Sequence, residues 1–160
     1  MHSIRNLALG LAALVMAVAA PGAQATGTHA GGHYGFGTPA TAAEATRTVK
    51  VSLTEDMRIV LDLPEVRRND VIRFVVTNTA TVPHEFSIGD SASQRAHAAM
   101  MKKMPDMKHE NDPTALTLAP GETRELAWRF DKEVKGRIVL ACQMPGHYDS
   151  GMVSQIPFVK

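Results

Sequence analysis

The sequence is short of cysteine and of surplus charge, and both shortages limit what the protein can do. Cys142 is the only cysteine among 160 residues, so no disulfide can form within the chain. Lys and Arg number 17 against 16 Asp and Glu, which gives a formal net charge of +1 at pH 7. A surface that binds nucleic acid needs an excess of basic residues, so nucleic acid is not an expected partner.

The apolar run near the N-terminus is too short to anchor the chain in a membrane. It extends from Leu7 to Ala20, whereas a spanning helix needs about 20 apolar residues. Arg5 precedes the run, and Ala23-Gln24-Ala25 supplies the small residues that a signal peptidase recognises. We therefore expect residues 1–25 to be a cleaved signal peptide, which leaves an exported protein without a membrane anchor.

Export makes the single thiol informative. Disulfides form readily outside the cytoplasm, yet Cys142 has no second cysteine to pair with. A free thiol in an oxidising compartment is open to damage unless something binds it. A metal ion would protect Cys142 in this way.

The rest of the chain divides into a leader and a domain. Residues 26–46 are rich in Gly, Ala and Thr, carry His29 and His33, and are interpreted as a flexible leader without a packed core. From residue 47 to residue 160, apolar and polar residues alternate in short runs separated by turns, which predicts an antiparallel β-sandwich. The predicted strands cover residues 49–53, 57–61, 71–78, 84–88, 126–130, 137–142 and 153–159.

One stretch between the predicted strands has the pattern of a helix instead. It runs from Ser91 to Met104, is rich in alanine, can be capped by Asp90 or Ser91, and stops before Pro105. The domain is therefore expected to be all-β with a short helical insertion.

The residues with the clearest chemistry lie near the C-terminus, in Cys142-Gln-Met-Pro-Gly-His147-Tyr-Asp-Ser-Gly-Met152. A thiol, an imidazole and a thioether follow one another at equal spacing on a loop between two predicted strands. A thiolate, two imidazoles and a weak thioether suit both Cu(I) and Cu(II). Zinc prefers four strong ligands, and methionine is a poor one for it. The pattern therefore predicts a copper site.

The second imidazole has to come from elsewhere in the chain. His84 is the best candidate, because it follows Val82-Pro83 at the mouth of a loop between two predicted strands. Strand alternation places Ile138, Leu140 and Cys142 on one face, so the thiol should point toward the core. Pro145 and Gly146 then shape the turn that directs His147 to the same metal.

These residues resemble the type 1 copper proteins, or cupredoxins, a family that includes plastocyanin, azurin and the phytocyanins. The interval from Cys142 to His147 resembles azurin, and that from His147 to Met152 resembles plastocyanin. The segment from Pro83 to Gly89 and the Met/His-rich insertion resemble the bacterial periplasmic cupredoxins linked to copper tolerance. The resemblance covers residues 49–160 and implies a Greek-key β-sandwich, a periplasmic monomer and one type 1 copper held by His84, Cys142, His147 and Met152.

The sequence departs from the family pattern at one position. Many cupredoxins have Asn after the first histidine ligand, whereas this chain has Glu85. The surroundings of the metal, and with them its reduction potential and colour, are therefore expected to differ.

The helical insertion contains a second group of metal-binding residue types. His97, Met100, Met101 and Met104 recur at helical spacing, and Met107 and His109 follow them. Methionines at this spacing are usually core residues. Charged neighbours such as Lys102 and Lys103 make a deeply buried helix hard to arrange, so a second copper site that binds Cu(I) through these six residues is the alternative.

Two functions fit these observations, and a third does not. The protein can contribute to copper tolerance by binding and redox cycling copper, or it can carry electrons to and from a redox partner protein. A multicopper oxidase needs His-x-His pairs for its trinuclear cluster, and the chain has none. We therefore do not expect an enzyme.

Overall fold

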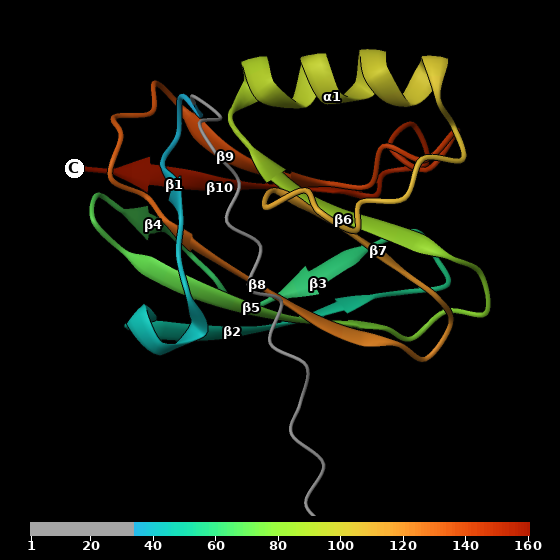
Figure 1. The fold of residues 1–160 in the computed structure, drawn as a ribbon, viewed down its shortest axis with the longest axis horizontal. Coiled ribbons are helices and arrows are strands. Elements are labelled where there is room, and N and C mark those ends of the chain that lie inside the picture. Colours follow the sequence, from blue (N-terminus) through green and yellow to red (C-terminus); the bar gives the residue numbers. More distant parts are fainter. Residues whose placement is uncertain (1–33) are drawn as a thin grey trace, which may run out of the picture.

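The computed structural model describes residues 34–160, and it contains two five-stranded sheets that face each other (Figure 1). The predicted signal peptide and residues 26–33, with His29 and His33, lie outside the described residues. In the first sheet the strand order is β1 (Thr38–Pro39), β8 (Thr123–Arg129), β5 (Val71–Asn78), β2 (Arg47–Leu53) and β3 (Ile59–Leu61). In the second it is β4 (Val66–Arg67), β10 (Val153–Val159), β9 (Arg137–Ala141), β6 (His84–Gly89) and β7 (Ala115–Leu118).

The core lies between the two sheets and is built by strand alternation. On β5, Ile72, Phe74 and Val76 are all fully buried. Phe74 meets Phe86 of β6 with ring centroids 5.6 Å apart, which joins one sheet to the other. The predicted β-sandwich is confirmed. The apolar residues that alternate along the strands face the layer between the two sheets and form its core.

Both sheets are mixed, whereas the sequence pattern predicts antiparallel pairing throughout. β2 runs parallel to β5, and β4 runs parallel to β10. The chain reaches β5 from β2 by way of β3 and β4, and this long path allows the two strands to point the same way.

The α-helix α1 (Ser91–Lys103) confirms the predicted insertion. Asp90 is the N-cap, and its Oδ1 accepts a hydrogen bond of 2.7 Å from the backbone N–H of Ser93. The helix packs on β6 and β9, over the sheet face that points away from the sandwich core (Figure 1). Because the core and the helix cover its two faces, β6 is buried at every position.

The predicted leader needs a correction at its C-terminal end. Residues 34–46 belong to the fold: β1 pairs with β8, and a short 3-10 helix follows at Ala42–Glu44. Phe36 is fully buried and stacks on Trp128 at a centroid distance of 4.7 Å. Composition suggested a solvated tail, but the aromatic side chain of Phe36 is part of the core and packs on Trp128 of β8. Within residues 34–160, no helix is long and apolar enough to cross a membrane.

Candidate metal centre

The loop between β9 and β10 carries three of the four predicted ligands and is closed by its own backbone. Cys142 N donates to Met152 O at 3.1 Å, and Met152 N donates to His147 O at 3.0 Å. Gly146 and Gly151 adopt positive φ angles of 82° and 99°, which side-chain-bearing residues rarely adopt. These contacts bring the three ligand positions to one end of the sandwich.

His84 reaches the same end because of strand pairing. β6 is antiparallel to β9, with Ser87 opposite Ala141. The start of β6, with His84, and the end of β9, followed by Cys142, therefore lie at the same end of the sandwich. His84 Nδ1 is 3.2 Å from His147 Nδ1, and Cys142 Sγ is 3.4 Å from the same nitrogen. The donor atoms of His84, Cys142 and His147 all lie within 4.8 Å of one another.

These separations fit one metal ion. With metal–nitrogen bonds of about 2.0 Å and metal–sulfur bonds of about 2.3 Å, donors at bond angles of about 90–120° are roughly 2.8–3.7 Å apart. The measured separations of 3.2 and 3.4 Å fall in this range without movement of a side chain. A thiolate with two imidazoles is the donor set of a trigonal copper site.

Burial controls the protonation of these donors. Burial lowers the pKa of His84, and the neighbouring His147 lowers it further. Burial also lowers the pKa of His147, so both imidazoles are held in the neutral form that binds metals. Burial raises the pKa of the Cys142 thiol to about 12. The sulfur accepts a hydrogen bond of 3.3 Å from the backbone N–H of Glu85, which favours the thiolate once a metal displaces the proton.

Met152 is fully buried beside these donors. Its backbone bonds to Cys142 and His147 fix its position at the base of the loop. Its role as a weak axial ligand remains a prediction.

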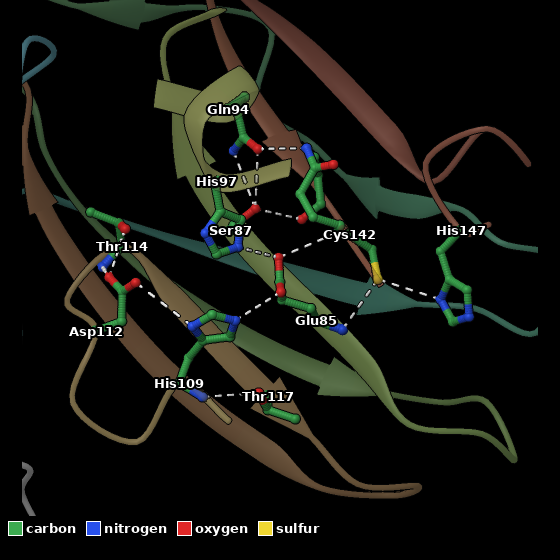
Figure 2. A network of polar contacts seen from close by, with 12 residues as sticks. Glu85, Ser87, Gln94, His97, His109, Asp112, Thr114, Thr117, Cys142 and His147 are labelled. Atoms are coloured by element: carbon green, nitrogen blue, oxygen red, sulfur yellow. Dashed lines mark hydrogen bonds and ion pairs between the residues drawn. The ribbon is translucent and has the colours of Figure 1, made fainter. Parts of the chain in front are cut away.

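Glu85, the residue that departs from the cupredoxin pattern, lies at the centre of a second buried cluster (Figure 2). Its side chain is 1% exposed. Oε1 accepts a hydrogen bond from His97 Nε2 and Oε2 accepts one from His109 Nε2, each at 2.9 Å. Oε1 also accepts a hydrogen bond of 3.3 Å from the backbone N–H of Gln143. Glu85 thus links β6, helix α1, the segment after α1 and the copper-ligand loop.

The charges in this cluster are opposite and mutually stabilising. Burial opposes ionisation of Glu85, but hydrogen bonds from His109 and His97 outweigh it and hold the pKa of Glu85 at about 2. Burial likewise disfavours charged His109, but Asp112 and Glu85 together raise the pKa of His109 to about 9. His109 Nδ1 lies 3.7 Å from the Asp112 carboxylate.

Comparison with known proteins places this geometry in a family. The chain is 41% identical to the copper-resistant cuproprotein CopI of Rubrivivax gelatinosus over 133 residues, covering 80% of this chain and 79% of that protein. It is also 41% identical to CopI of Vibrio cholerae over 121 residues, covering 75% and 70% of the two chains. The chain belongs to the CopI family of cuproproteins. The predicted resemblance to copper-tolerance cupredoxins is thereby confirmed.

Solved structures agree at the level of fold. Auracyanin from Roseiflexus castenholzii matches with a TM-score of 0.56 and 20% identity, covering 72% of this chain and 99% of that one. Auracyanin B matches with a TM-score of 0.57 and 20% identity, covering 78% and 97% of the two chains. Both support the cupredoxin β-sandwich. No protein-family model matches the chain.

The predicted second site is only partly assembled from the residues named for it. His97 and His109 converge, with ring centroids 4.9 Å apart. Met101 is buried under the helix, whereas Met104 is 48% exposed. Metal binding by Met100, Met101, Met104 and Met107 remains a prediction. Sequence reasoning missed that the two histidines both contact Glu85, although the presence of Glu85 where many cupredoxins have Asn was a usable signal.

Proposed function

We propose that this protein binds one copper ion through His84 Nδ1, His147 Nδ1 and Cys142 Sγ, with Met152 as a weak axial ligand, and that it serves copper tolerance. The observation that carries the proposal is the convergence of these three donors from distant parts of the chain. The names of the CopI relatives support the choice of metal and of process. When bound, copper supplies reversible one-electron chemistry between Cu(I) and Cu(II).

The residues of the chain set the conditions for that chemistry. His84, Cys142 and Met152 are fully buried, so three of the four ligands are shielded from water and cannot rearrange freely. Fixed ligands that suit both oxidation states reduce the reorganisation that accompanies electron transfer. The burial of these ligands therefore supports the proposed redox cycling of copper.

We further infer that the chain acts in the periplasm, as a monomer and without turning over a substrate. The N-terminal segment with its Ala23-Gln24-Ala25 sequence supports export. A single cysteine, bound to metal, suits an oxidising compartment.

An electron carrier is the alternative within the same fold. His147 is only partly buried, and the neighbouring Tyr148 is 38% exposed, so the copper-ligand loop offers an edge where a redox partner protein can dock. A strain that lacks the protein distinguishes the two functions. Loss of growth in copper supports tolerance, whereas loss of respiratory electron flux with normal copper tolerance supports the carrier.

The metal site itself is tested by absorption spectroscopy of the copper-loaded protein and of Cys142→Ser. Intense visible charge-transfer bands are expected in the parent protein and should be absent from the variant, because they require the thiolate. Met104→Leu, an exposed methionine outside the loop, is the matched control and should retain the bands. Bands that persist in Cys142→Ser would refute the proposed ligand set.

A further inference from the structure

We propose that Glu85, His97 and His109 form a second metal site, separate from the Cys142 site, and that it binds Cu²⁺. The proposal goes beyond the type 1 site, because its ligands are different residues. It shares His97 and His109 with the predicted Cu(I) site, but its third donor is the Glu85 carboxylate and not a methionine.

The donor atoms of the three residues lie close enough together to share a metal ion. His97 Nε2 and His109 Nε2 each lie 2.9 Å from a carboxylate oxygen of Glu85. One donor atom from each of the three residues can be chosen so that all lie within 4.8 Å of one another. Ligands bound at about 2.0–2.2 Å with an angle near 90° are separated by roughly 3 Å. A metal ion can therefore bridge Glu85 to each histidine with little movement of the side chains.

The ring of His109 lies between two carboxylates. A metal-binding histidine usually presents one ring nitrogen to the metal and the other to a carboxylate or carbonyl oxygen that fixes the ring. His109 approaches this pattern: its Nε2 is hydrogen-bonded to Glu85, and its Nδ1 lies 3.7 Å from the Asp112 carboxylate, within ion-pair distance but too far for a hydrogen bond. Asp112 is itself held by the Thr114 hydroxyl at 2.7 Å and the Thr114 backbone N–H at 2.8 Å. A carboxylate held by Thr114 therefore lies close to Nδ1, on the side of the ring away from Glu85 (Figure 2).

Without a metal, the cluster is a set of buried charges. A buried set of charges rarely stabilises a fold more than apolar side chains of the same size would. Here three separate segments, namely β6, α1 and the chain after α1, each contribute one polar side chain to a single buried point. The side chain of His109 is fully buried and that of His97 is 12% exposed, so His97 is the ligand nearest to solvent and marks a route of entry.

The donor set selects the ion. Two imidazoles and a carboxylate suit Cu²⁺ and Zn²⁺, and among the first-row divalent ions such sites bind Cu²⁺ most tightly. Cu(I) prefers sulfur donors, which this trio does not supply. Three protein ligands also leave a coordination position open.

The location places the second metal close to the first. His84 and Glu85 are consecutive residues of β6, so their side chains point to opposite faces of the strand. Glu85 N also donates to Cys142 Sγ. One strand therefore separates the two sites, with the sandwich core on one side and α1 on the other.

Copper stoichiometry tests the proposal. The full chain carrying His29→Ala and His33→Ala, which removes two other histidines that could bind metal, is equilibrated with Cu²⁺, freed of weakly bound ions and assayed for metal. Two copper ions per chain are expected, and the second should give an electron paramagnetic resonance signal with the wide hyperfine splitting of nitrogen and oxygen ligation. His97→Gln or His109→Gln should reduce the content to one. Arg95→Gln, an exposed residue of the same helix, should leave it at two.

Several results would overturn the proposal. The first is a metal content of one copper per chain before any change to the cluster. The second is a second copper ion that stays bound in both His97→Gln and His109→Gln. The third is a second site that takes up Zn²⁺ but not Cu²⁺. The visible bands of the Cys142 site report folding in each variant. Bands that persist while the second ion is lost support the second site, and loss of the bands alone counts against the proposed function instead.

Because one variant can fail to fold, Glu85→Gln provides an independent check. Glutamine keeps the size of the side chain and one acceptor oxygen but removes the charge. We expect its affinity for the second Cu²⁺ to fall at least tenfold, measured by competition with a chelator. An affinity equal to that of the parent would show that the cluster is only a hydrogen-bonded support for the fold.

Discussion

Cys142 shows how a single residue obtains its chemistry from its surroundings. Burial alone makes the thiol a poor nucleophile, with a pKa of about 12. Burial also holds the nearby imidazoles in the neutral form that binds metal, and the Glu85 N–H donates a hydrogen bond to the sulfur. Both effects favour a metal-bound thiolate. Burial therefore makes the thiol less open to oxidation than an exposed one, and the neighbouring imidazoles place it to share a soft metal ion.

Met152→Leu tests the axial ligand. Leucine has nearly the volume of methionine, so the fold should lose less than about 1.5 kcal/mol of stability. Loss of the thioether removes a weak donor that helps to stabilise Cu(II), so we expect copper to remain bound with a raised reduction potential. A redox titration monitored by the visible bands measures the change.

Met144→Leu is the matched control, because Met144 lies on the same loop and is only partly buried against the core. Its reduction potential should equal that of the parent protein. If Met152→Leu also leaves the potential and the spectrum unchanged, Met152 is a packing residue and not a ligand.

The elements of the fold differ in how far the sequence predicts them. Long alternating strands such as β5 are evident from their pattern, and α1 is evident from its cap and its alanines. The short strands β1, β4 and β7 were missed, because two to four residues carry too little periodicity. The parallel pairing of β2 with β5 depends on the path of the chain and not on local sequence.

The same distinction applies to the candidate site. The spacing of Cys142, His147 and Met152 is local, so the sequence alone indicates the loop. The meeting of Glu85 with His97 and His109 depends on how α1 folds back over β6. A contact of that kind is set by tertiary packing, and no periodicity within one element predicts it.

The N-cap of α1 offers a test at the scale of an element. Asp90→Ala removes the acceptor of the Ser93 N–H, and we expect a loss of about 1 kcal/mol in the free energy of unfolding. Chemical denaturation measures this loss. Ser91→Ala, an exposed residue in the first turn, should change stability by less than about 0.5 kcal/mol. Equal values for the two variants would contradict the assigned cap.

At the scale of the whole molecule, the segment before β2 completes the sandwich. Gly37 packs so closely on β8 that a Cβ atom there would lie 2.0 Å from the Arg129 carbonyl oxygen. Phe36 is buried next to it on Trp128. The segment is therefore a structural part of the domain, and the boundary at residue 46 drawn from composition does not describe the folded chain.

Phe36→Ala tests this view of the domain. Loss of a fully buried phenylalanine should lower the free energy of unfolding by about 3–5 kcal/mol. Val82→Ala, at a position that is 36% exposed, should change it by less than about 0.5 kcal/mol. If Phe36→Ala is as mild as Val82→Ala in denaturant unfolding, residues 34–46 do not stabilise the fold.

The central claim is that the single thiol shares one copper ion with two imidazoles. X-ray absorption at the copper edge tests it most directly, on protein loaded with one copper ion per chain. The account predicts one short copper–sulfur distance and two copper–nitrogen distances, with the short sulfur contribution absent from Cys142→Ser. A copper environment of nitrogen and oxygen alone in the parent protein would contradict it.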